Sequence, residues 1–83
     1  MTDPVSDHWA SHPITTTAHL ALFLGGSHDS FTGLLLVLFQ KADPGNYARL
    51  KDAFPEQAQA YETWMAMSPA PTFAQLREAL EAS

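Results

Sequence analysis

The sequence contains no cysteine, and this absence excludes several chemistries at once. Disulfide bonds, cysteine-based zinc fingers, iron–sulfur clusters and cysteine nucleophiles all need a thiol. Charge is also sparse, because only 16% of the 83 residues are Asp, Glu, Lys or Arg, whereas 46% are hydrophobic. Disordered tails have the opposite composition. We therefore expect one small folded domain and exclude a multidomain enzyme.

Basic residues are few and are confined to the second half of the chain. Residues 1–40 contain neither lysine nor arginine, and the whole sequence has four basic and nine acidic residues, which gives a formal net charge of −5. A nucleic-acid-binding surface needs clustered cations that face the phosphates. We therefore expect no nucleic-acid partner. An acidic chain can still bind a protein that presents a basic surface.

Long apolar runs are missing as well. The runs at residues 20–24 and 34–39 are far shorter than the roughly 20 residues that cross a bilayer. Residues 1–13 lack the positive start and the apolar centre of a signal peptide. The sequence therefore predicts a cytoplasmic protein with no membrane-spanning segment.

The residues that are present favour helices. The apolar set contains 13 Ala and 10 Leu but only three Val or Ile, and Ala and Leu lose little side-chain entropy in a helix. Proline and glycine divide the chain after residue 13 into five segments of ordinary helix length. We therefore predict an all-α fold, a compact bundle of four to five short helices. Residues 1–13 form an irregular lead and residues 14–83 a single helical domain.

Capping residues predict where the helices begin and end. Thr15 or Thr16 can cap a first helix that Gly25 ends, although the β-branched residues from Ile14 onward also fit a short strand. The predicted N-terminal caps of the later helices are Asp29 or Ser30, Asp43 before Pro44, and Thr72 in a capping box with Gln75.

The predicted helix at about residues 30–42 differs from the others because it is apolar nearly all round. Its core stripe is predicted to consist of Phe31, Leu34, Leu35, Leu38 and Phe39. Leu36 and Val37 extend the apolar surface round a second side, beside Gly33. This helix is either the buried centre of the bundle, or its second side is a subunit or partner interface. The interface candidates are Trp9, Phe31, Gly33, Leu36 and Val37, and Trp9 alternatively packs back onto the helices.

All four histidines lie within the first 28 residues. His8 and His12 are four residues apart, as paired metal ligands on a helix are, and His19 follows. No stable helix is predicted over residues 6–12, and a closed zinc site needs four ligands. We therefore favour neither a metal nor any other cofactor, and His8, His12 and His19 remain weak candidates. A response to pH near neutrality is a related hypothesis.

The glycine-rich segment before the apolar helix has two interpretations. Its candidate residues are Gly25, Gly26, Ser27, His28 and Asp29, which precede a helix N-terminus where amides can hold an anion. The segment lacks the lysine of a phosphate-binding loop. Consecutive Ser, His and Asp residues cannot form a catalytic relay, because each side chain must face the next across space. A tight turn is the favoured interpretation, and no catalytic residue is predicted.

Four stretches resemble a group of small, uncharacterised helical proteins of actinobacteria and their phages. They are residues 22–33 (LFLGGSHDSFTG), 41–50 (KADPGNYARL), 53–55 (AFP) and 64–69 (WMAMSP). The resemblance implies a short stand-alone gene product and transfers no catalytic residue. We therefore expect a non-enzymatic, homodimeric protein-interaction protein, such as a phage-encoded or regulatory binder of a host protein. A small-ligand or metal-binding module that uses the histidines and the GGSHDS turn is the alternative, and an enzyme that uses the same turn is a third possibility.

Overall fold

A computed structural model describes residues 10–27 and 29–82 and folds them into five helices. The helices are α2 (Thr17–Phe23), α3 (Phe31–Lys41), α4 (Pro44–Ala53), α5 (Pro55–Ala66) and α6 (Phe73–Ala82). The only β feature within these ranges is an isolated antiparallel bridge between Pro13 and Thr72. The predicted compact all-α fold is therefore confirmed. Trp9, His8 and His28 lie outside the described residues.

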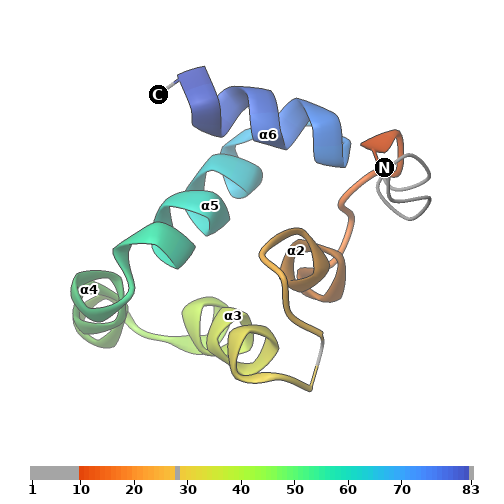
Figure 1. The fold of residues 1–83 in the computed structure, drawn as a ribbon. Helices are drawn as coiled ribbons and strands as arrows, with labels where there is room; N and C mark the ends of the chain where they lie inside the picture. Colours follow the sequence, from red (N-terminus) through yellow and green to blue (C-terminus); the bar gives the residue numbers. More distant parts are fainter. Residues whose placement is uncertain (1–9, 28, 83) are drawn as a thin grey trace.

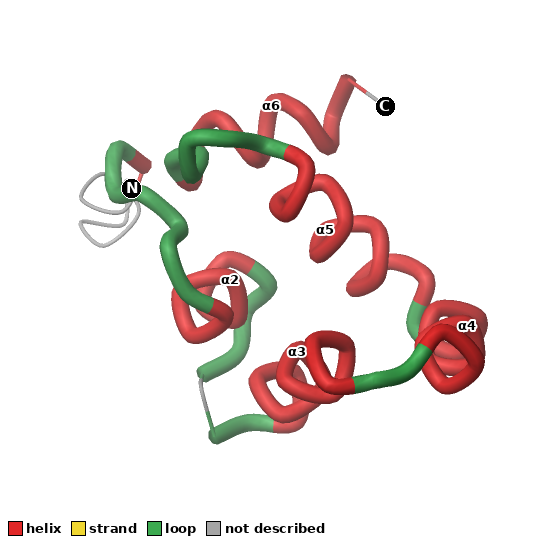
Figure 2. The backbone as a smooth tube through the Cα atoms, turned by 180° about the vertical axis from the view of Figure 1, so that it is seen from behind, coloured by secondary structure: helices red, strands yellow, loops and turns green. Residues whose placement is uncertain are grey.

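The five helices curve round a shared interior (Figure 1). α2 packs against α3, and α5 contacts α3, α4 and α6 in turn. Seen from behind in Figure 2, α5 again runs between α4 and α6, with α2 and α3 on the opposite side of the interior. No helix in the described part of the chain is long and apolar enough to cross a membrane.

Side-chain caps begin four of the helices at residues that the sequence predicts. The capping residues are Thr16, Ser30, Asp43 and Thr72. At α6 the capping box is reciprocal, since the amide of Gln75 donates to the Thr72 hydroxyl at 3.1 Å and the amide of Thr72 donates to the Gln75 side chain at 2.9 Å. Gly25 follows α2 with a φ of +88°, a left-handed conformation that favours glycine.

The core contains apolar side chains from α2, α3, α5 and α6 and from Ile14. Its buried members are Ile14, Leu20, Ala21, Leu35, Leu36, Phe39, Ala58, Tyr61, Trp64, Phe73 and Leu76. α4 has no buried residue and lies at the edge, where Tyr47 and Leu50 are half-buried against this core. α4 therefore contributes to the border of the core and not to its centre.

The segment before α2 is tied into the domain by backbone and side-chain hydrogen bonds. The amide of Ile14 donates to the Pro71 carbonyl at 2.8 Å, and the amide of Phe73 donates to the His12 carbonyl at 3.1 Å. The Trp64 indole donates to the Ile14 carbonyl at 2.6 Å. Because Ile14 itself is completely buried, residues 12–14 help to close one side of the core.

Candidate interaction surface

α3 has two apolar faces, and only one of them packs into the core. Its buried residues are Gly33, Leu35, Leu36 and Phe39. On the other face Phe31, Leu34 and Leu38 are 69%, 58% and 52% exposed. We call these three side chains the α3 stripe. The exposed apolar face thus contains Leu34 and Leu38, which the spacing assigned to the core, and does not contain Leu36, which the spacing assigned to the second side.

Two predicted interface residues require correction. Leu36 is completely buried and Gly33 is also buried, so neither can contact a partner on an exposed face. Val37 is half-buried at the border of the two faces. Each residue turns the helix by about 100°, so Leu36 lies roughly opposite Leu34. Because both sides of α3 are apolar, the spacing alone could not decide which side faces α2 and α5.

Phe31 is the predicted interface candidate that the structure places on the exposed face. Its ring lies 5.5 Å from the ring of Phe54, measured between centroids, at an interplanar angle of 57°. Such a tilted aromatic pair restricts the side chain although most of its surface is in contact with water. Phe31 thus has an aromatic contact within the chain while most of its surface remains available to a partner.

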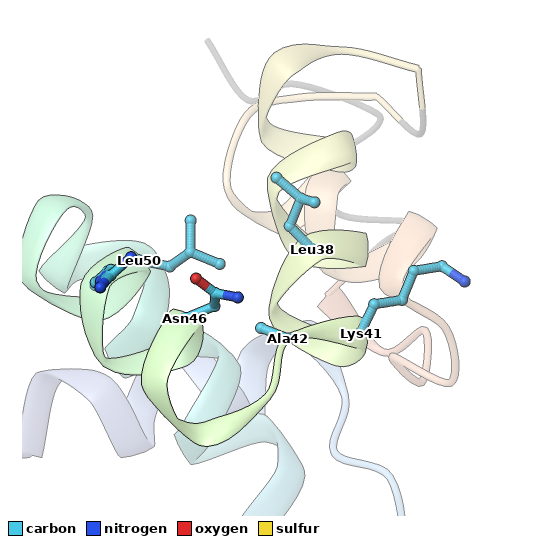
Figure 3. A pocket seen from close by; sticks show the side chains of 6 residues that line it. Leu38, Lys41, Ala42, Asn46 and Leu50 are labelled. Atoms are coloured by element: carbon cyan, nitrogen blue, oxygen red, sulfur yellow. The ribbon is translucent and has the colours of Figure 1, made fainter.

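A groove of about 420 Å³ lies beside the α3 stripe, between α3 and α4. It is lined by Leu38, Lys41, Ala42, Asn46, Arg49 and Leu50. Figure 3 shows Leu38 and Leu50 extending from the two helices toward the space between them, while Lys41 points to the far side of α3. The groove therefore joins the stripe to α4 and provides a hollow with apolar walls next to exposed side chains.

Charged groups lie at the ends of the α3 stripe and along the groove, and not within the stripe itself. The α3 sequence from residue 31 to residue 40 contains no charged side chain. Lys41, at the end of α3, and Arg49, on α4, are both exposed. Asp29 is exposed just before α3 begins, and its carboxylate accepts a hydrogen bond from the Ser27 hydroxyl at 2.8 Å. The surface thus has an apolar centre with an acidic group before its start and basic groups near its end.

A second polar cluster connects α4 to α5. The Tyr47 hydroxyl donates to Glu62 Oε2 at 2.8 Å, and Lys51 Nζ donates to Glu62 Oε1 at 3.1 Å. Burial and then the hydrogen bond to Glu62 raise the pKa of Tyr47 to about 12. The hydrogen bonds from Tyr47 and Lys51 lower the pKa of Glu62. A phenol that ionises less readily is unsuited to act as a nucleophile, so this cluster fits a role in holding the two helices together.

Two of the three predicted histidine candidates lie close together. The Nε2 atoms of His12 and His19 are 3.4 Å apart, and the two rings meet edge to face with centroids 4.7 Å apart. The Thr15 hydroxyl lies 3.2 Å from Nδ1 of His19. Within residues 10–27 and 29–82, no group of three His, Asp or Glu side chains is arranged to hold a metal. The third candidate, His8, lies outside these ranges.

The glycine-rich segment uses its backbone amides internally. Gly25 N donates to the Leu22 carbonyl at 3.1 Å, and Gly26 N donates to the Ala21 carbonyl at 2.7 Å. Ser27 N donates to the Ser30 hydroxyl at 2.9 Å. Amides that already have protein acceptors are not directed at an anion, so the geometry favours the tight-turn interpretation over anion binding. His28, the remaining candidate, lies outside the described residues.

Sequence reasoning missed several residues of this surface. Leu34 and Leu38 were assigned to the core, and Asn46, Arg49 and Leu50 of α4 were not assigned to this surface. A signal was available in the spacing of residues 31, 34, 38 and 41, which is the three-four-three spacing of a helix-packing seam. Comparison with known protein families, with curated proteins and with solved structures found no match to this chain.

Proposed function

We propose that this chain is a non-enzymatic protein-interaction protein of the cytoplasm that binds its partner through the α3 stripe. The observation that carries this proposal is the exposure of three large apolar side chains on one face of one helix. Exposed apolar side chains scattered singly are normal, whereas contiguous ones are typical of interaction sites. The groove beside Leu38 extends the same surface toward α4.

Covering the α3 stripe would contribute a substantial part of the binding free energy of a complex. Complete burial of a Leu or Phe side chain is worth roughly 1.5–3 kcal/mol. More than half of each stripe residue is still exposed, so covering the three would contribute about 3–5 kcal/mol in total. Because association itself costs roughly 4–15 kcal/mol, a stable complex also needs the apolar surface that the partner buries and additional contacts, such as those in the groove.

The resemblance to small proteins of actinobacteria and their phages suggests a biological setting for such a complex. A phage-encoded or regulatory binder of a host protein is consistent with a small domain whose exposed surface is apolar on one helix. Self-association through the same surface is equally consistent with it.

Affinity purification from the native cell with three forms of the chain tests the proposal. Leu34→Glu places a carboxylate in the stripe, whereas Met65→Glu makes the same change at a 59% exposed residue of α5. We expect proteins or further copies that bind the wild type and Met65→Glu but not Leu34→Glu. Recovery that is identical for all three forms would contradict the proposal. Circular dichroism of each variant checks that the fold is unchanged.

The histidine pair supports a second candidate function, a transition-metal site. Two nitrogen ligands at about 2.0–2.1 Å from a tetrahedral zinc ion lie about 3.3–3.4 Å from each other. The Nε2 atoms of His12 and His19 are already 3.4 Å apart. The Thr15 amide donates to Nδ1 of His19 at 3.4 Å, which places the ring proton of His19 on Nε2, between the two rings, where a metal ion would have to replace it.

Calorimetric titration with zinc ions tests this candidate. We expect one ion to bind per chain, and we expect His12→Ala and His19→Ala each to weaken binding about tenfold or more. His8→Ala then reports whether the third predicted histidine takes part. Absence of binding at millimolar zinc, or binding that neither His12→Ala nor His19→Ala changes, would contradict the candidate.

A further inference from the structure

The α3 stripe has the spacing of a helix–helix seam. Phe31, Leu34, Leu38 and Lys41 follow one another at intervals of three, four and three residues. This is the spacing with which two helices pack side chains of one into gaps between side chains of the other. A partner that fits the stripe is therefore itself a helix with an apolar seam. The described part of this chain offers one such exposed seam, on α3.

The seam is complementary to itself when two copies run in opposite directions. If the axis relating them passes near Leu34, this residue meets its own copy. Phe31 of each chain then lies opposite Leu38 of the other. Leu38 lines the groove between α3 and α4, which has a volume of about 420 Å³. The projecting Phe31 ring of one copy thus faces the hollow beside Leu38 of the other, and the relation holds in both directions.

The charges distinguish this orientation from the parallel one. Asp29 precedes α3 and Lys41 is its last residue, and both are exposed. Antiparallel packing about Leu34 brings Asp29 of one copy toward Lys41 of the other at both ends of the seam. Parallel packing would instead place like charges together at each end. Opposite charges at the rim set the orientation of an apolar interface, and like charges oppose it.

We propose that the partner of the α3 stripe is a second copy of this chain, with the two α3 helices packed antiparallel around a twofold axis at Leu34. This inference rests on the proposed function and makes it specific. It commits to a self-complementary interface in which Phe31, Leu34 and Leu38 form the centre and the Asp29–Lys41 pairs form the two ends.

The oligomeric state of the full chain provides the first test. Sedimentation equilibrium from about 1 to 200 µM should show a monomer–dimer equilibrium that reaches twice the mass of one chain. Leu34→Glu places two carboxylates at the twofold axis, and we expect it to raise the dimer dissociation constant about tenfold or more. Met65→Glu, the matched change on α5, should leave the constant unchanged. Asp29→Lys and Lys41→Asp should each weaken the dimer, and their combination should restore it.

The orientation can be tested by cross-linking, because the chain has no cysteine of its own. Phe31→Cys and Leu38→Cys are prepared separately and then mixed under oxidising conditions. Antiparallel packing predicts a disulfide in the mixture between the two different variants and little in either variant alone. Parallel packing predicts the reverse.

Each remaining outcome overturns the inference in a defined way. A chain that stays monomeric at about 200 µM refutes the dimer. If a monomeric chain still captures another protein through the stripe, the proposed function stands without the dimer. If it captures nothing, both fail. A dimer that Leu34→Glu leaves intact refutes the assigned interface, and disulfides within each single variant refute the antiparallel arrangement.

Discussion

Trp64→Phe tests whether the segment before α2 is held by one buried hydrogen bond. The Trp64 indole donates to the Ile14 carbonyl at 2.6 Å, across 50 positions of the sequence. Trp64 is 9% exposed and Ile14 is completely buried. Phenylalanine keeps an aromatic ring at this position but removes the donor. The Ile14 carbonyl would then be buried without its partner.

Trp64→Phe should lower the free energy of unfolding in two ways, by removing the hydrogen bond to the Ile14 carbonyl and by reducing the packed ring area. A buried carbonyl left without a hydrogen bond costs about 1–3 kcal/mol. Truncating a buried tryptophan to alanine costs about 3–5 kcal/mol. Replacing it by the smaller phenylalanine ring loses only part of this packing energy, and we take that part as about 1 kcal/mol. The total of roughly 2–4 kcal/mol is a large part of the roughly 4–12 kcal/mol expected for a domain of this size. It corresponds to a decrease in Tm of roughly 8–30 °C.

Tyr61→Phe is the matched control for this substitution. Tyr61 lies on the same helix, is also 9% exposed, and its hydroxyl takes part in none of the hydrogen bonds found among the described residues. Removing this hydroxyl should change stability by no more than about 0.5 kcal/mol. Urea unfolding followed by circular dichroism, at one protein concentration for all variants, measures both free energies of unfolding.

Amide hydrogen exchange separates a local effect from a general one. The Ile14 amide donates to the Pro71 carbonyl at 2.8 Å and should exchange slowly while the segment is docked. We expect Trp64→Phe to accelerate its exchange more than Tyr61→Phe does. A loss below about 1 kcal/mol, or Ile14 exchange that is equal in the two variants, would refute the reasoning.

Two further predictions concern the α4–α5 contact and the turn before α3. Because the pKa of Tyr47 is raised to about 12, its neutral form stabilises the fold fully below pH 10, and this contribution is lost between about pH 10 and 12. Tyr47→Phe should therefore reduce the alkaline loss of stability, and an unchanged pH profile would contradict the assignment. A Cβ atom at Gly26 would lie 2.7 Å from Oγ of Ser30, so Gly26→Ala should destabilise by about 1–3 kcal/mol. Gly45→Ala, which meets no atom closer than 3.5 Å, should be neutral or stabilising, and equal thermal stabilities of the two variants would contradict this reasoning.

Most of the fold could be predicted because the helix boundaries are determined by capping residues close to them in the sequence. Asp43 accepts the amide proton of Asn46 at 2.8 Å, and Pro44 occupies the first helical turn, as the sequence alone indicates. The Thr72–Gln75 capping box likewise depends on residues only three positions apart. Such signals require no knowledge of the tertiary structure, so sequence reasoning can find them.

The candidate site could be predicted only in part, because it depends on contacts between helices. The sequence showed that α3 is apolar on both sides, but packing against α2 and α5 determines which side is buried. Met65 illustrates the same problem, since this large apolar side chain is 59% exposed although its neighbour Trp64 is buried. The contribution of α4 to the groove depends on how two helices diverge. Local sequence does not contain that information.

The exposed apolar residues of the α3 stripe are a feature of this helix and do not follow from the overall composition of the chain. α6 places Gln75, Arg77, Glu78 and Glu81 at exposed positions, so this helix uses polar side chains where it faces water. α3 has leucine and phenylalanine at equivalent exposed positions and no charged residue before Lys41. The folded monomer gains little from these residues, because more than half of each remains in contact with water. Covering the stripe accounts for their chemistry better than the stability of the monomer does.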